Sequence, residues 1–154
     1  MKKNNLLNCL YQFEEKLAQW LSPLALLALR VYVAWQFLLA GWLKAQNWNA
    51  TLSLFQDEYK VPVLPPELAA YMGTVGELGF ASLLILGVLG RPAALGLFAV
   101  NLMAVISYPQ LREFTCPAAL NDHFYWGVML LLAAIIGPGK LSVDAFLKRR
   151  LTAA

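Results

Sequence analysis

The sequence predicts an all-α integral membrane protein, built as a four-transmembrane-helix bundle with an interfacial N-terminal amphipathic helix and a short C-terminal helix. Of its 154 residues, 60% are hydrophobic and only 14% are charged, whereas soluble domains carry about 25% charged residues. The mean hydropathy is +0.57. A soluble core of this size cannot hide so many apolar side chains, because small domains expose most of their residues. Four apolar runs supply the predicted spans.

The N-terminal segment, residues 1–21, has the spacing of an amphipathic helix. Its apolar residues recur every three or four positions, which places them on one helical face opposite polar residues. The segment is too polar to cross a bilayer, so we expect it to lie in the cytoplasmic interface, with Trp20 at head-group level. A helix packed on a soluble partner is the alternative. The apolar face comprises Leu6, Leu10, Phe13, Leu17 and Trp20.

The membrane domain is predicted to occupy residues 22–147, followed by a basic cytoplasmic tail at 148–154. Ser22 and Pro23 have the residue types of an N-cap and a first helical position, which predicts that a new helix starts there. Each following run approaches the length of about 20 residues that a bilayer requires. The runs are 24–43, 68–89, 92–108 and 121–136.

Two shorter helices are predicted outside these spans. In the first outer loop, Trp48, Leu52, Phe55 and Tyr59 fall on one helical face, which is typical of a short interfacial helix. Near the C-terminus, Ser142 is a suitable N-cap for a last short helix.

The distribution of Lys and Arg predicts the orientation. Eight of the twelve lie in the N-terminal segment, the 90–91 turn or the C-terminal tail, three lie in the opposite loops, and Arg30 lies within a span. Because positive residues favour the cytoplasmic side, both termini are expected in the cytoplasm. The net charge is +3, and the basic residues lie mostly at the ends and in short loops. This pattern does not suggest a nucleic-acid-binding protein.

The polar residues inside the spans are the candidate site, because burying them in lipid is costly unless they are paired. Counted along each predicted span, Arg30, Glu77 and Asn101 lie at similar depths. We therefore expect Arg30 to pair with Glu77 inside the bundle, with Asn101 nearby and apolar walls from residues such as Phe37 and Leu102. The pocket would bind a quinone, a proton or a small polar substrate. The alternative is a structural ion pair that fixes the helix register.

A second group, Lys44, Cys116 and His123, is predicted at the outer face. One histidine and one cysteine supply too few ligands for a metal site. Thiol exchange would need a second cysteine, and Cys9 is expected on the other side of the membrane. The alternative for His123 is an interfacial polar residue beside a belt of aromatic side chains.

Taken together, several motifs resemble the DoxX family of small bacterial four-helix membrane proteins, over about residues 22–147. Arg30 is followed by a motif at the end of the first span, Glu77 lies in a Glu-Leu-Gly motif, and Gly90-Arg91-Pro92 leads into the third span. The most specific match is the closing stretch at 137–144. The motifs are Gly41-Trp42-Leu43-Lys44, Glu77-Leu78-Gly79, Leu86-Gly87, Gly90-Arg91-Pro92-Ala93-Ala94, Phe124-Tyr125-Trp126 and Gly137-Pro138-Gly139-Lys140-Leu141-Ser142-Val143-Asp144.

The resemblance implies a protein of the bacterial cytoplasmic (inner) membrane. Relatives are linked to sulfur and thiol redox complexes, including a type of subunit that passes electrons from thiosulfate to quinone. The expected function is a membrane subunit of such a complex, quinone-linked and not catalytic on its own. A membrane scaffold for a soluble partner and a small-substrate transporter are the alternatives, and whether the protein forms a homo-oligomer stays open.

Overall fold

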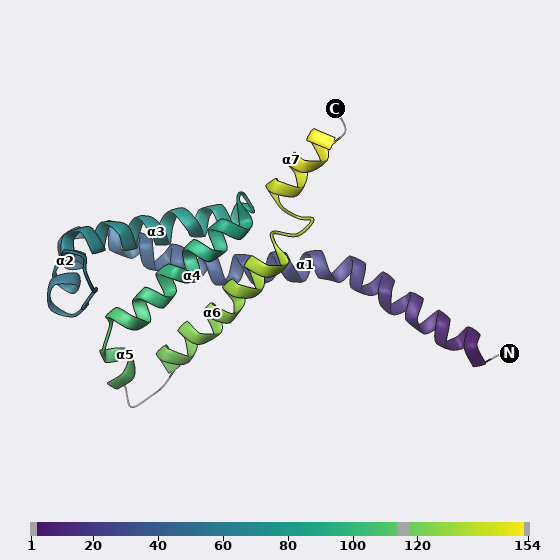
Figure 1. Ribbon diagram of the computed structural model, residues 1–154, viewed down its shortest axis with the longest axis horizontal. Coiled ribbons are helices and arrows are strands. Elements are labelled where there is room, and N and C mark those ends of the chain that lie inside the picture. The colour runs from purple at the N-terminus through teal and green to yellow at the C-terminus, as the bar shows by residue number, and fades with distance from the viewer. Residues whose placement is uncertain (1–2, 114–117, 153–154) are drawn as a thin grey trace.

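The computed structural model describes residues 3–113 and 118–152, and within these ranges every regular element is a helix (Figure 1). Four of the helices, α1, α3, α4 and α6, are long and apolar enough to cross a membrane. The predicted all-α bundle with four spans is thereby confirmed. In chain order the helices are α1 (Lys3–Gln46), α2 (Trp48–Asp57), α3 (Pro66–Leu86), α4 (Gly90–Ser107), α5 (Gln110–Glu113), α6 (Ala118–Ile136) and α7 (Val143–Thr152).

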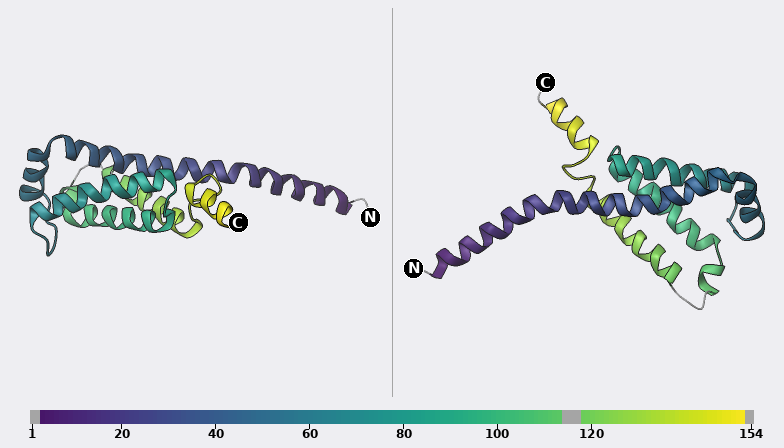
Figure 2. Two further views of the ribbon diagram at one scale, coloured as in Figure 1. Left: turned by 90° about the horizontal axis from the view of Figure 1, so that it is seen from above. Right: turned by 180° about the vertical axis from the view of Figure 1, so that it is seen from behind.

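The four spans pack in a closed order. Helix α1 packs against α3, α3 against α4, α4 against α6, and α6 returns to α1. Helix α2 lies at one end of the bundle (Figures 1 and 2). The N-terminal half of α1 and helix α7 both leave the bundle at the opposite end (Figures 1 and 2). Both described chain ends therefore lie on the same side of the bundle.

The prediction that a new helix begins at Ser22 and Pro23 is wrong. Helix α1 runs without a break from Lys3 to Gln46, with Pro23 inside it. An internal proline removes one backbone hydrogen bond, a loss that membrane helices tolerate. The same Ser-Pro pair therefore fits both a helix start and a helix interior, and the apolar residues on either side continue one helix. The N-terminal half of α1 extends beyond the bundle as a consequence.

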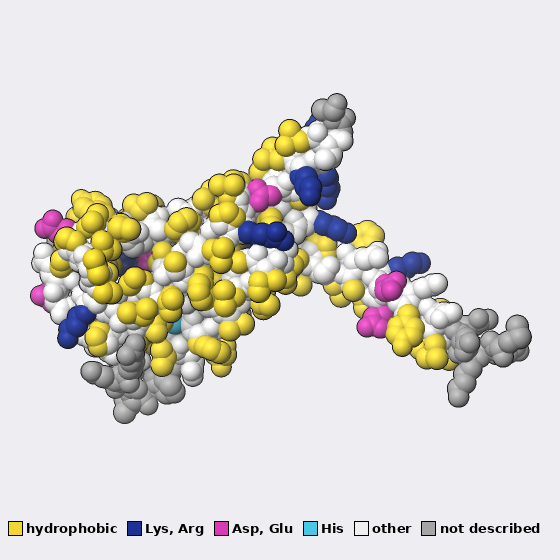
Figure 3. All heavy atoms as spheres, viewed as in Figure 1, with side chains coloured by type: hydrophobic (Ala, Val, Ile, Leu, Met, Phe, Trp, Pro, Cys, Tyr) yellow, Lys and Arg dark blue, Asp and Glu magenta, His cyan; other side chains and the backbone are white. Residues whose placement is uncertain are grey.

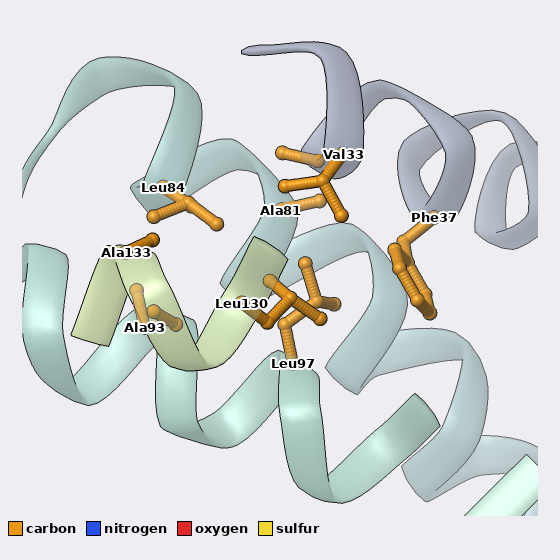
Figure 4. Packing of buried hydrophobic residues seen from close by; sticks show 10 residues of the cluster. Val33, Phe37, Ala81, Leu84, Ala93, Leu97, Leu130 and Ala133 are labelled. Carbon is orange, nitrogen blue, oxygen red and sulfur yellow. The ribbon is translucent and has the colours of Figure 1, made fainter. Parts of the chain in front are cut away.

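The core of the bundle is built from small and branched residues on the four spans. Val33 and Phe37 on α1 meet Leu84 on α3, Leu97 on α4 and Leu130 on α6 (Figure 4). Alanines fill the narrow positions between them and let the helices approach closely. Large apolar side chains such as those of α4 and α6 are exposed around the outside. The bundle thus has a thin core and an apolar outer surface suited to lipid.

Both predicted short helices are present. Phe55 of α2 is buried with Ala69 and Ala70 of α3, and Trp48, Leu52 and Tyr59 pack on them. The first three residues of the predicted apolar face thus lie on α2, whereas Tyr59 follows the end of the helix at Asp57. The hydroxyl of Ser142 accepts a hydrogen bond from the backbone N–H of Ala145 at 3.1 Å, so Ser142 does cap α7. Helix α2 and the segment that follows it close one end of the bundle beside α3.

Candidate functional site

The central polar contact in the bundle is an ion pair between Lys44 on α1 and Glu77 on α3. The Lys44 Nζ atom lies 2.8 and 2.7 Å from the two carboxylate oxygens of Glu77. The side chains are only 15% and 10% exposed. Gly41 makes this approach possible, because a Cβ atom there would lie 2.9 Å from the Cβ of Glu77. The two helices thus hold a bidentate, largely buried ion pair.

The predicted pairing of Arg30 with Glu77 is wrong. Arg30 packs against Gly87, the residue that ends α3, where a Cβ atom would lie 2.9 Å from its guanidinium. Glu77 lies ten residues earlier, roughly 15 Å along the helix. The prediction failed because the depth of Arg30 was counted from Ser22, whereas α3 ends level with Arg30 and the preceding residues of α1 extend beyond the bundle (Figure 1). Arg30 therefore lies at the end of the bundle and Glu77 well inside it.

Arg30 instead holds together the turn that closes the bundle. Its guanidinium donates hydrogen bonds to the backbone carbonyls of Pro138 and Leu141. In the same region the carboxylate of Asp144 accepts hydrogen bonds from the backbone N–H groups of Leu89 and Gly90, at 3.0 and 2.9 Å. Asp144 thereby satisfies free donors at the start of α4. Arg30 and Asp144 are structural residues in this arrangement.

The turn between α3 and α4 requires a glycine at position 87. Gly87 has a φ of 69°, a left-handed conformation that closes α3 and that glycine adopts at no steric cost. Its carbonyl accepts the backbone N–H of Asp144 at 3.0 Å. The predicted end of the second span at Leu89 is therefore three residues too late.

Asn101 on α4 pairs with His123 on α6 and takes no part in the Glu77 contact. Its Nδ2 donates to the His123 backbone carbonyl at 2.9 Å, and its Oδ1 lies 2.8 Å from the His123 Nδ1. The His123 ring also meets the edge of Trp126, with ring centroids 5.0 Å apart. The predicted residues thus fall into three separate contacts rather than one pocket.

Two of the three residues of the predicted outer-face group lie in the described part of the chain, and they belong to different contacts. Lys44 belongs to the Glu77 pair and His123 to the Asn101 pair, while Cys116 lies outside the described residues. Among the residues that the structure covers, no cluster of three His, Cys, Asp or Glu side chains is placed to hold a metal ion.

A cavity of about 360 Å³ lies beside the Lys44–Glu77 pair, between α3, α4 and the segment after α2. In Figure 3 a basic and an acidic side chain are visible together in a recess of the hydrophobic surface between α3 and α4. The predicted walls were wrong, because Phe37 packs in the core against Trp126 and Leu102 is exposed. Besides Lys44, Glu77, Tyr59 and Ser107, the lining is apolar or glycine: Phe55, Val61, Leu64, Ala69, Met72, Gly73, Gly76, Phe80, Gly96, Ala99, Val100, Met103 and Ala104.

An aromatic stack closes one end of this cavity. Tyr59 lies between Phe55 and Tyr108, with ring centroids 4.7 and 5.0 Å away. The Tyr108 hydroxyl donates to a Glu58 carboxylate oxygen at 3.0 Å. Burial, reinforced by the negative charge of Glu77, raises the pKa of Tyr59 to about 12. Tyr59 therefore keeps its hydroxyl proton near neutral pH and offers a neutral donor at the cavity wall.

Sequence reasoning missed Lys44 as the partner of Glu77, and it missed Tyr59 and Ser107 as lining residues. A usable signal was present for the first: Gly41 precedes Lys44 by one turn, and Gly76 adjoins Glu77. Small residues beside a charge on each of two helices mark a point of close approach in a membrane bundle.

The chain is similar to proteins of one known family. The DoxX family model matches residues 25–109, a range that holds the C-terminal half of α1 and all of the cavity lining. An uncharacterized protein of Haemophilus influenzae is 33% identical over 133 residues, covering 83% of this chain and 86% of that protein. No solved structure matches the chain. On the family match and this relative, the chain belongs to the DoxX family.

Proposed function

We propose that this protein is the membrane subunit of a redox complex and binds a quinone in the cavity beside Lys44 and Glu77. The observation that carries the proposal is a buried, bidentate ion pair on the wall of an otherwise apolar cavity of about 360 Å³. Small-molecule sites combine such apolar walls with a few convergent polar groups, in volumes of roughly 300–1,000 Å³. An intramembrane ion pair is also a functional candidate by default.

The cavity lining suits a head group with two oxygens on an apolar ring. The Lys44 ammonium is a donor for one carbonyl oxygen, and the Tyr59 hydroxyl is a second donor from another wall. The Glu77 carboxylate is an acceptor for a hydroxyl of the reduced form. A bound quinone takes up two electrons and two protons to become the quinol. The apolar side chains of Met72, Phe80 and Met103 would contact the ring and an apolar tail.

The source of electrons is proposed to be a partner that oxidises a thiol or another reduced sulfur compound. The DoxX family membership supports this choice, because the family resemblance implies sulfur and thiol redox complexes. In this arrangement the chain contributes the lipid-side quinone site and the partner contributes the oxidation of the sulfur compound.

We place the protein in the bacterial cytoplasmic membrane with both termini in the cytoplasm. The end of the bundle from which α7 and the N-terminal half of α1 depart carries most of the basic residues, and positive residues favour the cytoplasmic side. Because α1 continues without a break past the end of the bundle, its N-terminal half, with the exposed side chains of Leu6, Leu10 and Phe13, would then extend from the membrane into the cytoplasm (Figure 2).

A scaffold is the second candidate function, and the extension of α1 beyond the bundle favours it. Leu10, Phe13 and Trp20 are 56%, 65% and 80% exposed there, a face on which a soluble partner could dock instead of lipid. Removing residues 1–21 would release such a partner while leaving quinone binding unchanged. Substrate flux into liposomes without an electron acceptor would favour the transporter class.

The test is binding of a short-chain quinone to the full-length protein in mild detergent. Wild-type protein should bind saturably, and Lys44→Met should weaken binding about tenfold or more, the value of a lost charged hydrogen bond. Ala99→Phe should block the cavity that Ala99 lines. Leu102→Phe is the matched control, because Leu102 lies on the same helix and is exposed away from the cavity.

Two results would overturn the proposal. One is the absence of saturable quinone binding by folded wild-type protein together with its co-purifying partners. The other is equal loss of binding in Ala99→Phe and Leu102→Phe, which would show that the cavity is not the site.

A further inference from the structure

A second cleft, of about 660 Å³, lies at the opposite end of the bundle from the quinone cavity. It is lined by the start of α4, by the closing turn and by α7. Helix α4 begins its span at Gly90, and α6 ends its span at Ile136. The lining residues 89–92 and 138–139 directly adjoin these span ends, so the cleft lies where the bundle leaves the hydrocarbon layer.

The charges that line the cleft favour an anion. Arg91, Asp144 and Lys148 are its ionisable residues. The Asp144 carboxylate is already occupied by the backbone N–H groups that start α4. Arg91 extends across the end of α6, where its guanidinium donates to the Ile135 carbonyl at 3.4 Å. Arg91 and Lys148 are both exposed, so two cations remain available to a ligand.

Apart from Thr152 and two glycines, the rest of the cleft lining is apolar, and so is one face of α7. Leu147 and Leu151 line the cleft together with Leu89 and Pro92. Leu147 and Leu151 are 50% and 80% exposed, and no residue of α7 is buried. A helix with leucines on one side, Lys148 at the edge of that side and Arg149 opposite it has the pattern of a helix that lies in a membrane interface. Figure 3 shows basic side chains gathered where α7 leaves the bundle.

We propose that this cleft binds the head group of an anionic phospholipid. Arg91 and Lys148 would contact the phosphate from opposite walls, one on α4 and one on α7. Leu89, Leu147 and Leu151 would cover the first methylene groups of the acyl chains. The cleft lies at the level of the lipid head groups, its two cations match the phosphate, and its apolar walls match the start of the acyl chains. This site does not depend on the quinone proposal, since it shares no residue with the first cavity.

The test uses delipidated full-length protein in mild detergent, titrated with phosphatidylglycerol or phosphatidylcholine in mixed micelles. Phosphatidylglycerol should bind roughly 25-fold more tightly, because each of two basic residues near an anionic lipid contributes about fivefold. Arg91→Gln and Lys148→Gln should each weaken phosphatidylglycerol binding about fivefold. Arg91→Lys, which keeps the charge, should retain most of it, and this variant separates lost charge from lost folding.

Arg149→Gln is the matched control, because it removes the same charge from the same helix outside the cleft lining. It should change phosphatidylglycerol binding less than about twofold, since the charge lies outside the contact. A loss equal to that of Lys148→Gln would overturn the proposal in favour of general surface attraction. Displacement of the lipid by inorganic phosphate at similar affinity would overturn the assignment to a lipid, and equal binding of both lipids would overturn the anion site.

Discussion

Replacing Lys44 by methionine removes one partner of the buried ion pair and leaves the Glu77 carboxylate without its cation. At 2.7 Å and an effective dielectric constant of about 20, the attraction between the two charges is about 6 kcal/mol. Part of this is offset by the cost of removing both groups from water, and losing one partner of a buried pair costs about 3–5 kcal/mol. We therefore expect Lys44→Met to lower the free energy of unfolding by about 3–5 kcal/mol.

The assay is reversible unfolding in mixed detergent micelles, followed by circular dichroism. Lys44→Met with Glu77→Met should recover most of the lost stability, because apolar replacement of both partners is often neutral or stabilising. Arg30→Met with Glu77→Met should instead show additive losses within about 0.5 kcal/mol, since those residues do not touch. Arg149→Met is the exposed control, expected within about 0.5 kcal/mol of wild type.

Two outcomes would refute this reasoning about the ion pair. A loss below about 1 kcal/mol for Lys44→Met would show that the pair is hydrated and weak, as surface pairs are. Additive losses for Lys44→Met and Glu77→Met would show that the two residues do not stabilise each other.

Three further predictions concern the packing, a helix cap and a half-buried tyrosine. Gly41→Ala should lower the free energy of unfolding by about 1–3 kcal/mol, because the added Cβ would press on α3. Gly79→Ala has open space for the added Cβ, so it should be neutral or stabilising in the same unfolding assay. Asp144→Ala should cost about 1 kcal/mol through the lost α4 cap, and an unchanged unfolding free energy would contradict this role. Because the pKa of Tyr59 is raised to about 12 from 10.0, its contribution to stability is complete below pH 10 and is lost as the pH rises toward 12. Tyr59→Phe should remove this loss of stability at alkaline pH, whereas Tyr11→Phe, at an exposed position, should not. The free energy of unfolding is measured at each pH, and tyrosinate absorbance reports the ionisation of the tyrosines.

Much of the fold follows from the sequence because hydrophobic length and turn residues act locally. Apolar runs of about 20 residues predict spans, since every backbone group in lipid must be satisfied within a helix. The short outer helix and the Ser142 cap were also predictable, because a helical face and an N-cap are encoded within a few neighbouring residues. The continuation of α1 through Pro23 was not, because proline suits both the first turn and a tolerated kink.

The candidate site was predictable in its residue types but not in its pairings. Glu77 and Asn101 stood out because polar groups inside a span are costly without partners. Lys44 is the partner of Glu77 because Gly41 lets α1 and α3 approach at that level. Depth estimates could not find this partner, since they took Ser22 as the cytoplasmic end of the first span, whereas α3 ends level with Arg30. An error of a few residues in a boundary shifts a side chain by several ångströms along the helix.

The sequence by itself determined the class of the protein: an α-helical membrane bundle with four spans, polar groups inside them and basic ends. These features depend on composition and local periodicity, which need no knowledge of neighbouring helices. Only the tertiary structure decided that Lys44 meets Glu77 beside a cavity, that Asn101 meets His123, and that Arg30 holds the closing turn. The reason is that contacts between helices depend on axial register and on the small residues that set the spacing, and both are properties of packed pairs.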